Sequence, residues 1–265
     1  MNSAVLLAGI RDANYHRGGI RCLEVLCLQK AHFSQLRAEI QELCRREQGS
    51  NVGHPSHITS WTHPRGQVLQ FSLLNVSGRY DDFTSDHNLS CLSKQFHGGA
   101  AYPVLANFVS LFPHTINFRI NLMGPRSLLS PHEEHAVVRT STGSVGVRAR
   151  FHLPILTSPH AELTLDGWVY HLRAGSIYFV NHGCVHSACN SGQTVRIHLV
   201  WDMLLTREAF RFMFEEPTPI APLERISEEQ QVLVPVRTER VGAYLRLPPP
   251  VTRDEATQID WCEVQ

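Results

Sequence analysis

The sequence lacks the marks of three common classes of protein. Its seven cysteines are odd in number, scattered along 265 residues and never spaced as C-x-x-C, which argues against a disulfide framework or a structural zinc site. Lys and Arg together number 24, as do Asp and Glu, so no basic excess favours nucleic acid. No apolar run approaches the roughly 18 residues of a membrane span. We therefore expect a cytoplasmic protein that binds neither nucleic acid nor membrane.

The sequence also lacks internal repeats and low-complexity tracts. Hydrophobic residues make up 43% of the chain, which is enough for a large core. Six segments resemble strands, namely residues 67–75, 115–123, 145–156, 161–172, 176–181 and 194–203. The Asp166-Gly167 pair is a strong hairpin signal. This series of short strands predicts an all-β core, a double-stranded β-helix (jelly roll, cupin-like) with flanking helices.

A single domain in three parts is expected. Residues 1–66 would form an N-terminal cap of helix and loop, residues 67–205 the jelly-roll core, and residues 206–265 a C-terminal helix and a Pro-rich tail. The helix of the cap is predicted from apolar side chains that recur at helical spacing among polar ones. These side chains are Phe33, Leu36, Ile40 and Leu43.

Three of the predicted strands carry polar residues on one face, because alternate side chains of a strand point the same way. The polar sets are Asn117, Arg119 and Asn121; Arg148, Arg150 and His152; and Arg196 and His198. Any one such face could meet solvent. Three together favour a polar-lined barrel interior. Because a buried guanidinium is costly unless a carboxylate or phosphate meets it, that interior is expected to bind an acidic ligand.

The segment L-S-P-H-E-E-H, from Leu129 to His135, is a candidate metal site among the chain's 16 histidines. An H-E-x-x-H zinc site would need a histidine where the chain has Ala136. A histidine, a carboxylate two residues later and a distant second histidine instead match the two-His-one-carboxylate face of non-haem iron enzymes. His132, Glu134 and His186 fit that pattern. Alone, the segment could also be a solvated charged loop.

Four blocks in order carry a resemblance to a known family. They are S-P-H-E-E from Ser130 to Glu134, R-A-R-F-H-L-P from Arg148 to Pro154, G-S-I-Y-F-V-N-H-G-C-V-H-S from Gly175 to Ser187, and R-I-H-L-V-W-D from Arg196 to Asp202. Over about residues 115–205 the chain resembles the aspartyl/asparaginyl β-hydroxylase family, including its bacterial proline cis-4-hydroxylase branch. The resemblance implies a dioxygenase that uses Fe(II), 2-oxoglutarate and O2, hydroxylates an unactivated C–H bond, and converts 2-oxoglutarate to succinate.

The resemblance also implies roles for single residues. His132 and His186 fall on the iron ligands, and Arg196 on the arginine that binds the distal carboxylate of 2-oxoglutarate. Further co-substrate contacts would come from Arg150, His152 and Asn121. The proline hydroxylase relatives have Asp where this chain has Glu134, and the animal enzymes have no carboxylate ligand there; we predict that Glu134 is the third ligand.

Arg119 and Arg148 are left as candidate anchors for a second carboxylate, which favours a free amino acid or a small amino-acid-derived metabolite as substrate. The alternative for both is pairing with a Glu or Asp of the chain. Two other functions stay open: a peptide or protein Asp/Asn-type hydroxylase, and a non-catalytic cupin-like module that binds a metal or ligand. Substrate identity, the choice between hydroxylation, desaturation and ring closure, and the oligomeric state are not encoded in any motif.

Overall fold

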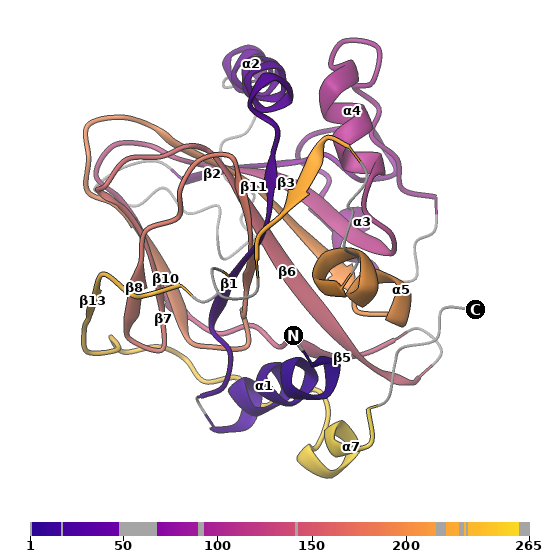
Figure 1. Ribbon diagram of the computed structural model, residues 1–265, viewed down its shortest axis with the longest axis vertical. Coiled ribbons are helices and arrows are strands. Elements are labelled where there is room, and N and C mark those ends of the chain that lie inside the picture. Colours follow the sequence, from indigo (N-terminus) through magenta and orange to yellow (C-terminus); the bar gives the residue numbers. More distant parts are fainter. Residues whose placement is uncertain are drawn as a thin grey trace.

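Two antiparallel sheets face each other in the computed structural model, which describes residues 2–16, 18–47, 68–89, 93–140, 143–215, 221–227, 231 and 233–259 (Figure 1). The larger sheet has the order β12-β1-β9-β6-β11-β3-β2, with β5 paired to β6. Its strands are β12 (Leu223–Arg225), β1 (Cys22–Leu28), β9 (Ser176–Val180), β6 (Val145–Leu156), β11 (Arg196–Leu204), β3 (Thr115–Met123), β2 (Val68–Ser72) and β5 (Val137–Arg139).

The smaller sheet has the order β13-β8-β7-β10-β4. Its strands are β13 (Arg237–Thr238), β8 (Trp168–Tyr170), β7 (Ala161–Leu165), β10 (His186–Asn190) and β4 (Ser127–His132). Asp166 and Gly167 both have positive φ, 49° and 81°, as a two-residue type I′ turn between β7 and β8 requires. The hairpin predicted at this pair is confirmed, and so is the double-stranded β-helix.

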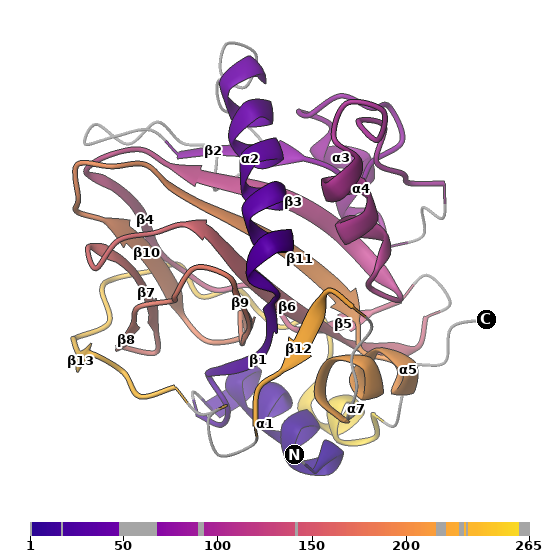
Figure 2. The same cartoon turned by 45° about the horizontal axis from the view of Figure 1, so that its top comes forward.

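The two faces of the larger sheet have different roles. Trp201 and its alternate neighbours on β11 are buried in the main hydrophobic cluster with Phe118 of β3 and Phe151 of β6. The same cluster includes side chains of several helices, and Figure 2 shows helices on the outer side of this sheet, away from the smaller sheet. The inner face is left for polar residues, which is why strands so rich in apolar side chains also carry arginine and histidine.

The helices are α1 (Ser3–His16), α2 (Lys30–Glu47), α3 (Phe83–His87), α4 (Pro103–Ser110), α5 (Arg207–Phe210), the π-helical turn η1 (Arg211–Glu215) and α7 (Arg253–Thr257). Of these, α1, α2, α4, α5 and η1 contribute side chains to the main hydrophobic cluster. The buried face of α2 contains Leu36, Ile40 and Leu43, as predicted. Glu39 on the same helix accepts hydrogen bonds from the backbone N–H groups of Val104 and Leu105 and so caps α4, at 3.2 and 2.8 Å.

The structure differs from the predicted three-part division at both ends of the chain. The segment expected to be a cap contains β1, which lies inside the larger sheet between β12 and β9. The segment expected to be a helix and tail contributes β12 and β13 to the two sheets. Residues 48–67, which include the whole loop predicted for the cap at residues 48–66, lie outside the described residues. Among the described residues, no helix has the length and apolar content needed to cross a membrane.

Candidate metal centre and buried anion site

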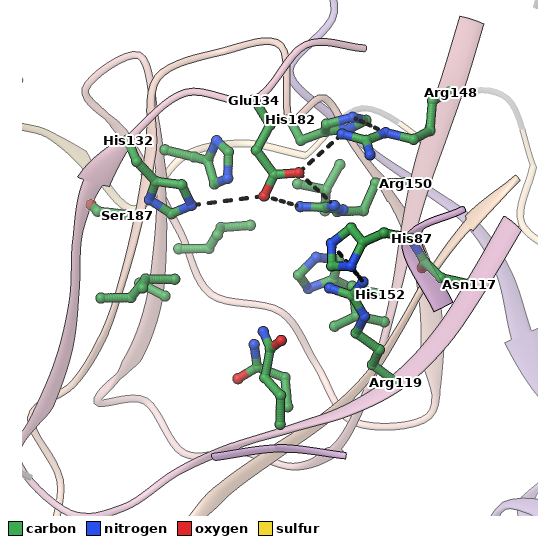
Figure 3. A pocket seen from close by; sticks show the side chains of 18 of the residues that line it. His87, Asn117, Arg119, His132, Glu134, Arg148, Arg150, His152, His182 and Ser187 are labelled. Atoms are coloured by element: carbon green, nitrogen blue, oxygen red, sulfur yellow. Dashed lines mark hydrogen bonds and ion pairs between the residues drawn. The ribbon is translucent and has the colours of Figure 1, made fainter. Parts of the chain in front are cut away.

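A cavity of about 440 Å³ lies between the two sheets, and α3 forms part of its wall (Figure 3). Every residue predicted for the site lines it: His132, Glu134, His186, Arg196, Arg150, His152, Asn121, Arg119 and Arg148. The strand faces identified by parity therefore do form a polar interior. The neighbouring side chains then decide what each of these residues is able to bind.

The two histidines meet because β4 and β10 are paired. His132 ends β4, His186 begins β10, and the two are directly opposite in the ladder with ring centroids 4.2 Å apart. One ligand atom from each of His132, Glu134 and His186 lies within 4.8 Å of the other two. The predicted ligand set is thus brought together.

Backbone hydrogen bonds orient both imidazoles. His132 Nδ1 lies 2.8 Å from the carbonyl oxygen of Ser130, and His186 Nδ1 lies 2.9 Å from that of Cys184. A carbonyl can only accept, so each Nδ1 donates and each Nε2 carries a lone pair, the tautomer of a metal ligand. Burial, reinforced by His132, lowers the pKa of His186 to about 3, so the imidazole stays neutral. These features fit a divalent metal ion.

Glu134 offers the carboxylate, and it is held by two arginines. Its Oε1 lies 4.0 Å from His132 Nε2, while Arg150 and Arg148 donate hydrogen bonds of 2.8 to 3.0 Å to its two oxygens (Figure 3). Burial alone would raise the pKa of Glu134, but the two guanidiniums outweigh it and hold that pKa well below its usual range. Glu134 is therefore ionised, as a metal ligand must be.

Asp202 is a member of the site that was not predicted. It is fully buried and accepts hydrogen bonds from Arg150 at 2.8 and 3.0 Å, and Arg148 Nε is 3.7 Å away. Burial would raise the pKa of Asp202, but the two guanidiniums lower it strongly. Asp202 has the same strand parity as Arg196 and His198, and that parity could have identified it.

The other end of the cavity holds Arg196, which is 4% exposed. Its guanidinium donates to Asn121 Oδ1 at 3.3 Å and to His198 Nδ1 at 2.8 Å, and no carboxylate of the described chain lies within ion-pair distance. Burial lowers the pKa of Arg196 to about 9. Burial, then the charge of Arg196, keeps the pKa of His198 and of His152 well below the usual range, so neither adds a positive charge. Arg196 is thus a buried cation whose described partners are all neutral.

Arg119, the first candidate substrate anchor, is paired inside the chain. Its guanidinium forms a fork with Asp86 of α3, with Nε 2.8 Å from Oδ2 and a further short contact from Nη2 to Oδ1. Nη2 also lies 2.8 Å from His87 Nε2. Figure 3 shows His87 and Arg119 across the cavity from His132. Arg148, the second candidate, is paired with Glu134, so the sequence alternative of carboxylate pairing describes both arginines.

The candidate metal-binding segment, Leu129–His135, is covered on its outer side by the C-terminal tail, residues 237–251. Leu247 N–H donates to Glu133 Oε1 at 2.7 Å. Gly242 lies so close to Pro131 that a Cβ there would be 3.1 Å from Pro131 Cγ. His132 and Glu134 point inward while Pro131 and Glu133 contact the tail, so the segment is held from both sides.

Solved structures of similar fold were found by comparison. The non-haem monooxygenase ThoJ with nickel is 15% identical over 94% of this chain and 92% of that chain, with a TM-score of 0.40. HygX from Streptomyces hygroscopicus, solved with nickel and 2-oxoglutarate, is 10% identical over 66% and 78%, with a TM-score of 0.38. The α-ketoglutarate-dependent carbocyclase SnoK from nogalamycin biosynthesis is 10% identical over 86% and 97%, with a TM-score of 0.39. These similarities concern the fold alone.

None of the curated protein sequences matches the chain. The sequence model of the aspartyl/asparaginyl β-hydroxylase family matches residues 30–205, which is more than half of the chain and includes the candidate metal ligands and Arg196. The resemblance seen in the sequence blocks is confirmed at this level: the chain belongs to the aspartyl/asparaginyl β-hydroxylase family, whose members use Fe(II) and 2-oxoglutarate.

Proposed function

We propose that this protein is an Fe(II)/2-oxoglutarate-dependent dioxygenase that hydroxylates a free amino acid or a small amino-acid-derived metabolite, as in the proline cis-4-hydroxylase branch of its family. One observation supports the co-substrate most strongly. Arg196 is a buried guanidinium without a carboxylate partner in the described chain, and it lines the same cavity as the His132 and His186 pair. A dicarboxylate that bridges metal and guanidinium would satisfy both.

The residues of the chain would divide the work between them. His132, Glu134 and His186 would hold ferrous iron, which supplies dioxygen activation when bound. Arg196 would bind the distal carboxylate of 2-oxoglutarate through its planar fork, and Asn121 holds that guanidinium in place. The fixed carboxylate at one end and the oriented imidazoles at the other set the position of the co-substrate.

The size of the cavity supports a small substrate. Ligand pockets span about 300 to 1,000 Å³, and this one, at about 440 Å³, must hold 2-oxoglutarate as well. Four guanidiniums line it (Arg119, Arg148, Arg150 and Arg196), and three carboxylates pair with them: Glu134, which also lines the cavity, and the fully buried Asp86 and Asp202. A substrate with a modest net charge fits that near balance better than one with several charges of one sign.

An anaerobic titration tests the proposal. Fe(II) and 2-oxoglutarate added to the metal-free protein should give the weak visible charge-transfer band of the chelate, and Arg196→Met should raise the 2-oxoglutarate concentration needed for it at least tenfold. With air admitted, succinate release should be stimulated by members of a panel of amino acids. No band in the wild-type protein would contradict the proposal and favour a binding module. Stimulation only by peptides would contradict the small substrate.

A further inference from the structure

The carboxylate of Asp202 has no part in the function proposed above. Its side chain is 0% exposed and its charge is paired with Arg150 of the neighbouring strand β6, directly opposite in the ladder. A buried ion pair adds little net stability compared with apolar residues of the same volume. Asp202 lies directly behind Arg148 and Arg150, which line the cavity, and this position suggests a role in the site.

Arg150 connects Asp202 to the metal-binding segment. One edge of its guanidinium, Nε and Nη2, binds the two oxygens of Asp202 at 2.8 and 3.0 Å. Its Nη1 and Nη2 bind the two oxygens of Glu134 at 3.0 and 2.8 Å. A single planar group thus joins two carboxylates, and the plane of one constrains the plane of the other.

The Asp202 end of this chain of contacts is the fixed end. Asn117 Nδ2 donates to Asp202 Oδ2 at 2.9 Å, and the backbone N–H of Asp202 donates to Asn117 Oδ1 at 3.1 Å. Glu134 lies after the end of β4, and its side chain is 29% exposed. The rigid strand residue therefore sets the orientation of the more exposed carboxylate.

Asp202 also limits how strongly the arginines compete with a metal ion. Arg148 and Arg150 both bind Glu134, and both have Asp202 within 4 Å. Without the charge of Asp202, Glu134 alone would face two guanidiniums. The two guanidiniums would then carry one more positive charge that no carboxylate balances, and this charge would repel a cation that approaches Glu134. The guanidiniums would also hold the Glu134 carboxylate more tightly, so it would be less available to the cation.

We propose that Asp202 is a positioning residue of the metal centre, which acts through Arg150 to hold Glu134 toward His132 and His186 and to leave that carboxylate available to a divalent cation. This inference rests on the proposed function, because it takes those three residues as ligands. The length of Glu134 gives a physical reason for it, since a glutamate has one more rotatable bond than an aspartate to be fixed.

Cobalt(II) binding tests the inference without turnover. Metal-free protein is titrated with Co(II) in the absence of 2-oxoglutarate, by calorimetry and by the visible absorption of the bound ion. Asp202→Asn keeps the shape of the side chain and removes its charge, and we expect affinity to fall about 10- to 100-fold with a changed Co(II) spectrum. Asp86→Asn is the matched control, since Asp86 is equally buried and fork-paired with Arg119; its affinity should stay within about threefold of wild type.

A double-mutant cycle separates positioning from a general effect of charge. In the Glu134→Ala background, Asp202→Asn should change Co(II) affinity by less than about threefold, because the residue through which it acts is gone. An equal loss in both backgrounds would overturn the inference, and so would wild-type affinity in Asp202→Asn. If that variant does not fold by circular dichroism, Asn117→Ala is used instead, because it keeps the charge of Asp202 and removes both hydrogen bonds between the Asn117 side chain and Asp202. It should give a smaller loss that also vanishes without Glu134; a loss that persists would overturn the inference. A wild-type protein that binds no Co(II) would instead overturn the proposed function.

Discussion

Arg119 on β3 and Arg196 on β11 reach into the same cavity from one sheet, and they are almost equally buried, at 6% and 4% exposed. Their partners differ. Arg119 forms a fork with the carboxylate of Asp86, whereas Arg196 has only an amide oxygen and a neutral imidazole among the described residues. Burial alone thus does not distinguish the arginine paired within the chain from the one that we propose binds 2-oxoglutarate, whereas the charge of the partner does.

The difference between the partners of Arg119 and Arg196 has an energetic consequence. Arg119 is neutralised in the folded chain, so its pair with Asp86 is complete without a ligand. Arg196 keeps its desolvation penalty until an anion arrives, which lowers its pKa to about 9 in the free protein. The fold therefore holds Arg196 in a state that a bound carboxylate improves. Four experiments on these two arginines and on the candidate metal-binding segment test this difference.

The largest expected effect is on stability. Arg119→Met leaves the buried carboxylate of Asp86 without its partner and should lower the free energy of unfolding by about 3 to 5 kcal/mol. Arg196→Met removes a buried cation that has no carboxylate and should leave that free energy unchanged or raise it. Urea unfolding of the two metal-free, ligand-free variants measures both. The double variant Asp86→Asn/Arg119→Met should recover part of the loss, and equal losses for the two single variants would contradict the contrast.

A smaller effect is expected on stabilisation by the co-substrate. With zinc in place of iron to prevent turnover, 2-oxoglutarate at about 100 times its dissociation constant should stabilise wild-type protein by about 2.7 kcal/mol. Arg196→Met should lose nearly all of this increment at the same concentration, and Arg119→Met should keep it on a lower baseline. Thermal unfolding with and without 2-oxoglutarate measures the increment. An increment retained in Arg196→Met would show that another group binds the distal carboxylate.

Arg196→Lys tests whether charge or shape matters at this position. Lysine keeps the positive charge but cannot make two parallel hydrogen bonds to one carboxylate. We expect affinity for 2-oxoglutarate to fall about tenfold, the value of one lost charge-assisted hydrogen bond of about 1.5 kcal/mol. Calorimetry with the zinc-loaded protein measures it. Wild-type affinity in Arg196→Lys would mean that the cavity recognises charge alone.

The sequence predicted the parts of this site that depend on local periodicity or on short motifs. Strand parity placed Arg148, Arg150 and His152 in the interior, and motif spacing identified His132 and Glu134 as candidate ligands. Both signals depend on residues a few positions apart, so they can be recognised without knowledge of the fold.

Contacts between segments far apart in the sequence could not be predicted in the same way. Asp86 lies 33 residues before Arg119 on α3, a helix of five residues that has too little sequence to show a period. The strand β1 (Cys22–Leu28) is buried at six of its seven positions, so its apolar run lacks the alternation that would distinguish it from a buried helix. Contacts with distant segments determine both the Arg119–Asp86 ion pair and the strand conformation of β1.

The smallest expected effect is on the outer side of the metal-binding segment. Glu133 accepts a hydrogen bond from Leu247 N–H at 2.7 Å, while its neighbour Glu134 points into the cavity. Glu133→Ala should lower the free energy of unfolding by about 0.5 to 1.5 kcal/mol and speed proteolysis of the tail, because one hydrogen bond that holds the tail is lost. Co(II) affinity should change by less than about threefold, whereas Glu134→Ala should lower it more than tenfold. The two adjacent glutamates thus differ in the side they face, since Glu133 holds the tail and Glu134 is the proposed metal ligand. A loss of Co(II) affinity in Glu133→Ala as large as that in Glu134→Ala would show that the tail is part of the metal centre.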